Sequence, residues 1–194
     1  MNYINVRRAK YLVLSVTGPY AGEVETNIYS RKMKEIENCG FTFWHHQSYQ
    51  AKPDLVQRIG FQAESERQRL YLVIISTGVH GSGLDTKKSK RATRYRTINR
   101  GDYEPIPPGI YVETGKRPYA LVIKDFSIID EEIDLWDYSN FDNPKRAIVI
   151  RQGGSTVCAI SRFSGNNLER MKSHVRKVVA CAEFVSPYSV WLGS

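Results

Sequence analysis

The chain has 194 residues, a length typical of a single domain, and 41% of them are hydrophobic, as in ordinary globular proteins. It carries 28 Lys and Arg against 20 Asp and Glu, a formal net charge of +8. No apolar run is long enough to span a membrane, and no stretch matches a signal peptide. The three cysteines are odd in number and widely spaced, which disfavours a disulfide framework and a zinc site. We therefore expect a cytoplasmic protein with no membrane contact, no cofactor and no metal.

The first half of the chain predicts three strands and two helices. Residues 10–17 and 70–76 are rich in β-branched and apolar side chains, which is typical of buried strands. Between them, apolar residues at helical spacing predict one helix over about 26–38. A short strand is expected over 41–44, and Pro53 fits the first turn of a second helix.

The second half predicts further strands and one more helix. Strands are expected over 110–113 and 119–125, and a glycine pair favours a hairpin within 147–161. Apolar side chains then recur at helical spacing, so residues 166–194 are expected to form a C-terminal helix and tail packed on the rest. These elements predict one α+β domain over residues 1–194, with about three helices and a mostly antiparallel curved sheet or partly open β-barrel.

The positive charge is concentrated in one stretch, Thr86–Arg100, which reads TKKSKRATRYRTINR. It holds seven basic side chains and no carboxylate, and the rest of the chain has 21 basic against 20 acidic residues. Like charges at this density repel one another, so they stay solvated or meet a partner of opposite sign. A phosphate backbone is the commonest such partner, which predicts a nucleic-acid-binding protein. The predicted phosphate-binding residues are Lys87, Lys88, Lys90, Arg91, Arg94, Arg96 and Arg100.

An acidic stretch in the same chain is an alternative partner for this charge. Residues 125–142 hold seven carboxylates and no Lys or Arg. The basic stretch could therefore dock on them within one molecule, although exposed ion pairs each contribute little stability. The sequence leaves both possibilities open.

Aromatic and imidazole side chains are the candidate groups for contacting bases. Trp44 and His46 belong to a polar cluster, WHHQSYQ, at the end of a predicted strand. Tyr95 lies between two arginines of the basic stretch, and Tyr103 follows it. Aromatic rings can stack on unpaired bases while neighbouring cations hold phosphates. We therefore add Trp44, His46 and Tyr95 to the predicted nucleic-acid-binding residues, for RNA or for DNA with or without modified bases.

Two other function classes remain open. The first is a metal-independent endoribonuclease in which His45, His46 or His80 acts as a general acid or base. The second is a protein-interaction module of a phage or defence system, whose basic loop meets an acidic protein surface. The sequence names no catalytic residue, so an enzyme is the less favoured interpretation.

The order of elements from Leu70 to Tyr138 resembles the PUA-like superfamily, including its EVE domains. The similar features are a strand with a glycine turn, LYLVIISTGVHGSG, a proline-rich approach, YEPIPPGIYVE, and a long strand running into an acidic segment, RPYALVIKDFSIIDEEIDL. The resemblance implies a curved barrel that binds RNA, or DNA with modified bases. It concerns the order of elements and not a motif, so it assigns no binding residue.

Overall fold

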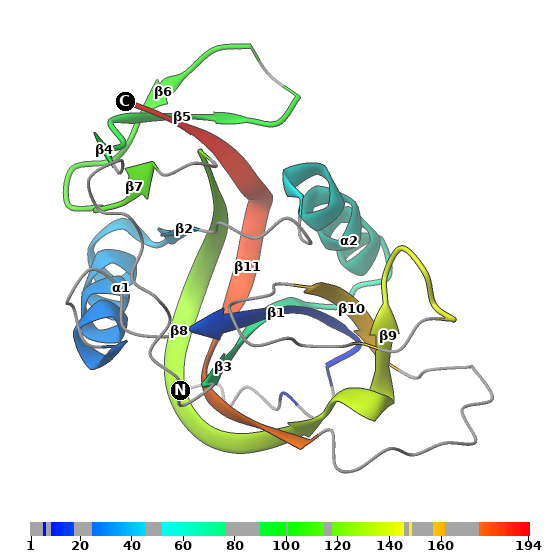
Figure 1. Cartoon of the computed structure of the whole chain (residues 1–194). Helices are drawn as coiled ribbons and strands as arrows, with labels where there is room; N and C mark the ends of the chain where they lie inside the picture. Colours follow the sequence, from blue (N-terminus) through cyan, green and yellow to red (C-terminus); the bar gives the residue numbers. More distant parts are fainter. Residues whose placement is uncertain are drawn as a thin grey trace.

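A computed structural model shows a nine-stranded sheet packed against two α-helices, α1 (Glu25–Cys39) and α2 (Pro53–Ser65) (Figure 1). The structure describes residues 6, 9–17, 25–45, 52–76, 90–99, 101–114, 118–145, 148, 157–161 and 175–194. Neither helix has the length and apolar character that crossing a membrane requires.

The sheet is mixed, open and mostly antiparallel. Its strand order is β2-β8-β11-β3-β1-β10-β9, with β5 beside the end of β11 and β6 beside β5, while β4 and β7 form a separate ribbon. Among the described pairings, β1 with β3 is parallel and the others are antiparallel. The strands are β1 (Tyr11–Thr17), β2 (Thr42–His45), β3 (Leu70–Ser76), β4 (Lys90–Arg91), β5 (Arg94–Thr97), β6 (Glu104–Pro105), β7 (Glu113–Thr114), β8 (Tyr119–Asp134), β9 (Tyr138–Asn140), β10 (Val157–Ser161) and β11 (Val175–Gly193), and a 3-10 turn covers Leu135–Asp137.

Two long antiparallel strands, β8 and β11, run through the whole molecule and bend strongly (Figure 1). The register between them shifts at three places along β11, and such bulges increase the bend and twist of a strand. On its other side β11 pairs first with β3 and then, near its C-terminal end, with β5. It is therefore a central strand that joins the two ends of the molecule.

The prediction of a C-terminal helix is wrong from Val175 to Ala182, because these residues belong to strand β11 (Val175–Gly193). Residues 162–174 lie outside the described part of the chain. Both faces of the run Val178–Ala182 are covered, because Ala180 and Ala182 belong to one hydrophobic cluster and Val178 and Cys181 to another. Apolar residues therefore need not alternate with polar ones here. That near-continuous run also satisfies helical spacing, and the two patterns cannot be separated by periodicity alone.

The predicted class is observed in part. The fold is α+β, and the strands at 11–17, 42–45 and 70–76 and both helices lie where the sequence predicts them. The sheet is not closed, since it ends at β2 and β9, and the described residues form two α-helices. A barrel and a third helix are therefore not confirmed. The strand predicted over 119–125 is longer than expected, because β8 continues into the acidic stretch as far as Asp134.

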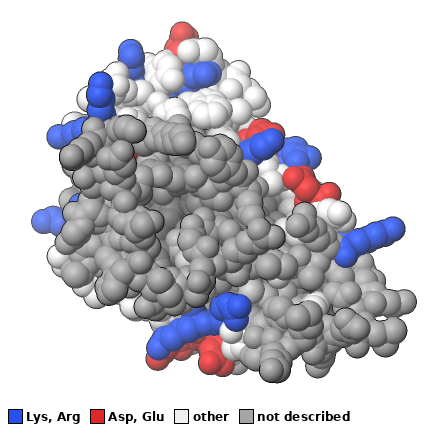
Figure 2. Space-filling model, in the orientation of Figure 1, with Lys and Arg blue, Asp and Glu red and all other residues white. Residues whose placement is uncertain are grey.

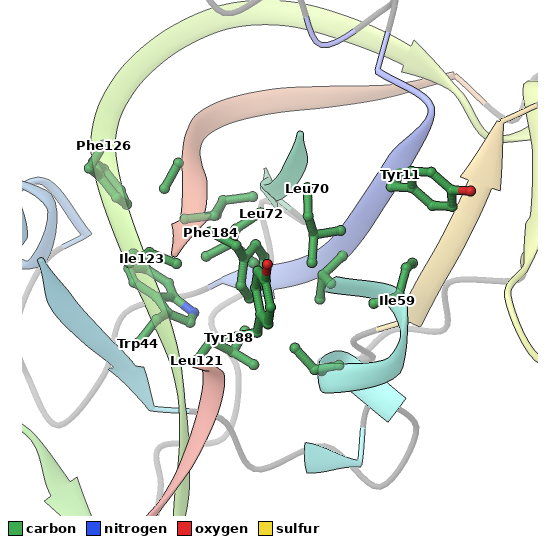
Figure 3. Packing of buried hydrophobic residues seen from close by; sticks show 14 of the residues in the cluster. Tyr11, Trp44, Ile59, Leu70, Leu72, Leu121, Ile123, Phe126, Phe184 and Tyr188 are labelled. Carbon is green, nitrogen blue, oxygen red and sulfur yellow. The ribbon is translucent and has the colours of Figure 1, made fainter. Parts of the chain in front are cut away.

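The main hydrophobic core lies between α2 and the sheet. Figure 3 shows Ile59, Leu72, Leu121 and Tyr188 gathered there, and all four are buried. Helix α2 comes very close to this core at Gly60, where a Cβ atom would lie 2.4 Å from Cγ of the Tyr188 ring. Glycine is required at this position because the ring occupies the space of a side chain.

Replacing Gly60 with alanine should destabilise the fold. Alanine is normally favoured over glycine inside a helix by about 1 kcal/mol, so a loss of stability would report the collision with Tyr188. We expect Gly60→Ala to lower the free energy of unfolding by about 1–3 kcal/mol, measured by urea denaturation. Gly101→Ala is the matched control, since nothing lies within 4 Å of the added Cβ there. Equal effects of the two changes would contradict the contact.

Candidate functional site

The described part of the basic stretch is held at the C-terminal end of β11. Strand β5 pairs with β11 on one side, placing Arg94 opposite Gly193 and Arg96 opposite Trp191, and with β6 on the other. Side chains alternate along a strand, so Arg94 and Arg96 share one face while Tyr95 points to the other. There the Tyr95 ring packs 5.1 Å from the Phe43 ring. The sheet thus fixes which basic side chains face outward.

Tyr103 has two guanidinium groups next to its ring. The Cζ atoms of Arg94 and Arg96 lie 5.1 Å and 5.5 Å from the ring centroid, within the range of a cation–π contact. The tyrosine is still 42% exposed. At Gly193, a Cβ atom would lie 3.0 Å from both Arg94 and Tyr103, so this pair lies directly over the strand.

Tyr111 has a second pair of guanidinium groups, which come from distant parts of the sequence. Cζ of Arg31, on α1, lies 5.1 Å from the ring centroid, and Cζ of Arg91, on β4, lies 5.6 Å from it. Tyr111 is 39% exposed, and its hydroxyl donates a hydrogen bond of 2.6 Å to Glu113. We refer to Arg31, Arg91, Arg94, Arg96, Tyr103 and Tyr111 together as the arginine–tyrosine surface.

A buried ion pair holds the backbone of Tyr111 against α1. Lys32 and Glu35, 5% and 3% exposed, lie one helical turn apart, with Nζ 2.8 Å from Oε2. Lys32 also donates to the Tyr111 carbonyl at 2.9 Å, and the Tyr111 N–H donates to Glu35 at 3.0 Å. The Thr42 hydroxyl of β2 donates to the same carboxylate. The pair therefore ties α1, β2 and the proline-rich segment together.

The phenols of Tyr95 and Tyr111 stay protonated at neutral pH. The hydrogen bond to the Glu113 carboxylate and then partial burial raise the pKa of Tyr111. Burial and then the 3.1 Å hydrogen bond to Glu104 raise the pKa of Tyr95. Neither ring therefore adds a negative charge that would oppose an anionic ligand.

The arginine–tyrosine surface is far from the acidic stretch. Residues 190–193 of β11 pair with β5, whereas residues 175–178 pair with Glu131–Asp134 of β8. Residues 178 and 190 are twelve positions apart, which corresponds to roughly 40 Å measured along the strand. Asp130 instead pairs with Lys177, at 3.0 Å. The described basic residues 90–99 therefore do not dock on the acidic stretch, which removes that alternative for this part of the chain.

Basic side chains gather over the end of the molecule that carries this surface. Figure 2 shows blue side chains along the upper left, where Figure 1 places β4 and β5. Among the described residues, no carboxylate lies within ion-pairing distance of Lys90, Arg91 or Arg94. Their guanidinium and ammonium donors thus remain open to an external anion.

The predicted site residues separate into three groups. Lys90, Arg91, Arg94 and Arg96 lie on or beside the arginine–tyrosine surface, with Tyr95 half-buried beneath it. The residues that lie outside the described part of the chain are Lys87, Lys88, Arg100, His46 and His80. His45 ends β2 opposite Ala120 and is half-buried.

Trp44 requires a correction, because its ring belongs to the core. It is 7% exposed and packs between Tyr29 and Phe126, with ring centroids 6.4 Å and 5.8 Å away. Its place in the polar cluster WHHQSYQ suggested an exposed indole, but β2 directs this side chain toward Tyr29 of α1 and Phe126 of β8. Trp44 is therefore not a base-stacking group.

Sequence reasoning missed Arg31 and Tyr111. Arg31 is one of several charged residues on the polar face of α1, and Tyr111 follows a proline-rich turn, so neither stands out by pattern. Arg31 and Tyr111 are 80 residues apart in the sequence. Only the tertiary structure brings them together beside the basic stretch. The single available signal was the stiffness of the proline-rich segment, which holds its tyrosine in a defined place.

A separate pocket of about 220 Å³ lies between the end of α2, the start of β3, and β11. Its polar groups are largely paired within the protein. The Tyr188 hydroxyl donates to Glu64 at 2.8 Å, and Arg69 pairs with Glu183 at 3.1 Å. No group of three His, Cys, Asp or Glu side chains suited to a metal occurs among the described residues. The arginine–tyrosine surface is the stronger candidate site.

The sequence matches no protein-family model, and comparisons with curated proteins and with solved structures gave no match.

Removing one partner of the buried ion pair should cost a large part of the stability. Glu35→Ala leaves the ammonium group of Lys32 buried without its carboxylate, which typically costs about 3–5 kcal/mol. We expect a loss of this size in the free energy of unfolding, measured by guanidinium denaturation. Glu37→Ala, on the exposed face of the same helix, is the matched control and should change stability by less than about 0.5 kcal/mol. Similar losses in both variants would show that the pair is not a special anchor.

Proposed function

We propose that the protein binds nucleic acid, with the arginine–tyrosine surface and Lys90 contacting the phosphate backbone. The observation that carries the proposal is the gathering of four guanidinium groups from α1, β4 and β5 around two exposed tyrosine rings. Guanidinium groups can stack on an aromatic ring and still direct their N–H donors to phosphate oxygens, often two at a time. The two tyrosines therefore hold the arginines without neutralising them.

The charge distribution supports phosphate binding over the alternative that the basic side chains are only solvated by water. Among the described residues, the acidic stretch does not relieve the repulsion between Lys90, Arg91 and Arg94, since no carboxylate lies within ion-pairing distance of these three. A polyanion would offset this repulsion and release its bound counterions, which is the main source of affinity for phosphate backbones. Lys87, Lys88 and Arg100 flank the described basic residues in the sequence and extend the proposed contact. The PUA-like resemblance remains a prediction, and the proposal does not use it.

The proposal is tested by the salt dependence of binding. Wild-type protein and the triple variant Arg91→Gln, Arg94→Gln, Arg96→Gln are titrated with labelled RNA and DNA at several salt concentrations. Losing three phosphate contacts should weaken binding and reduce the slope of log K against log salt by roughly 2–3.

The control for this test removes the same charge elsewhere. Lys10, Arg58 and Lys177 are exposed and lie in surface ion pairs outside the arginine–tyrosine surface, so their triple change to Gln matches the loss of three positive charges. Thermal unfolding of both variants verifies that they fold. Equal weakening by the two triple variants would contradict a localised site, and no binding at low salt would favour an acidic protein partner instead.

The same samples address the endoribonuclease alternative. Each binding reaction contains EDTA and is analysed on a denaturing gel afterwards. Intact RNA supports a binding protein. Cut RNA would make the protein a metal-independent nuclease, with His45, His46 and His80 as the first residues to replace.

A further inference from the structure

The exposed rings are a feature that phosphate binding alone does not require. Lysines and arginines on any polar surface can contact phosphates, whereas Tyr103 and Tyr111 expose 42% and 39% of their surface at the centre of the guanidinium groups. Phe61, with 49% exposure, lies on α2 and packs edge-on against Tyr188, outside the basic region. Exposed aromatic surface next to cations indicates a ligand with both charge and flat apolar faces.

Both rings are fixed before any ligand arrives. Tyr111 is held by its hydroxyl bond to Glu113 and by backbone hydrogen bonds to the Lys32–Glu35 pair. Tyr103 lies against Gly193 and contacts the side chains of Arg94 and Arg96. Much of the entropy of ordering these side chains is therefore lost on folding, which lowers the cost of binding.

The two rings flank the same short stretch of the chain. Tyr111 is beside Arg91 and Tyr103 is beside Arg94, and these arginines are three residues apart, at most roughly 10 Å along the backbone. A single strand of several nucleotides can therefore contact both rings. Each ring has its own cation pair, so each can hold one base while the adjacent guanidinium groups contact the phosphates on either side. A duplex cannot use this arrangement, since its bases are already stacked on each other.

We infer that the ligand of this surface is single-stranded nucleic acid, with Tyr103 and Tyr111 as stacking platforms for unpaired bases. This inference rests on the proposed function and narrows its substrate class. Stacking on an aromatic ring is tolerant of base identity, because every base has a π-face. The surface should therefore select for strandedness more than for sequence.

Binding to three probes of equal length, about 20 nucleotides, distinguishes contacts to bases from contacts to phosphates. The probes are an oligothymidylate, its abasic analogue, and a duplex. Wild-type protein should bind the oligothymidylate most tightly. Tyr103→Leu and Tyr111→Leu should each weaken that binding by roughly 5- to 150-fold and leave binding to the abasic strand within about twofold. Tyr→Phe at either position should retain most of the affinity. Phe61→Leu is the matched control and should change nothing.

The possible outcomes distinguish base stacking on the two tyrosines from phosphate binding alone. Equal binding of all three probes, or full affinity in the Tyr103→Leu, Tyr111→Leu double variant, would overturn the stacking role and leave phosphate binding in place. Equal weakening on the abasic strand and the oligothymidylate would also overturn it, because the rings would then only position the arginines. If no probe binds at low salt, the proposed nucleic-acid-binding function is itself contradicted.

Discussion

The geometry of the arginine–tyrosine surface depends on the buried ion pair between Lys32 and Glu35. Two charges removed from water are costly, and this pair is tolerated because both members are also hydrogen-bonded to Thr42 or to the Tyr111 backbone. The segment between β6 and β7 makes few backbone hydrogen bonds of its own. Its attachment to α1 is therefore tertiary, and the same contact that stabilises the fold fixes the position of an exposed ring.

The hydrophobic cluster beneath the surface completes this support. Phe43, Ile110, Val112, Val190 and Leu192 come from three separate segments, namely β2, the connection between β6 and β7, and β11, and all are buried there. Apolar packing on the inner side leaves the outer side free to carry charge, as expected for short strands with one covered face. The local order thus arises from the sheet and the core, and it does not depend on pairing the arginines with acidic residues.

Sequence patterns located elements well where one local signal dominated. The run at 70–76 is strand β3 because it is apolar, β-branched and followed by glycines, and Pro53 begins α2 as its fixed φ favours. Patterns failed where burial on both sides removed alternation, as in β11. They also failed for Trp44, since no local signal tells a core ring from a surface ring. Arg31 and Tyr111 meet only through long-range contacts, which periodicity cannot register.

The central position of β11 has a consequence for how the protein is made. This strand lies between β8 and β3 and supports β5, yet it is the last described element to leave the ribosome. Until it is synthesised, β3 and β8 have unpaired edges, and such edges invite pairing with other chains. The fold is accordingly completed after translation of this segment rather than stepwise during it, and chains that stop before residue 175 should be substrates for chaperones and proteases.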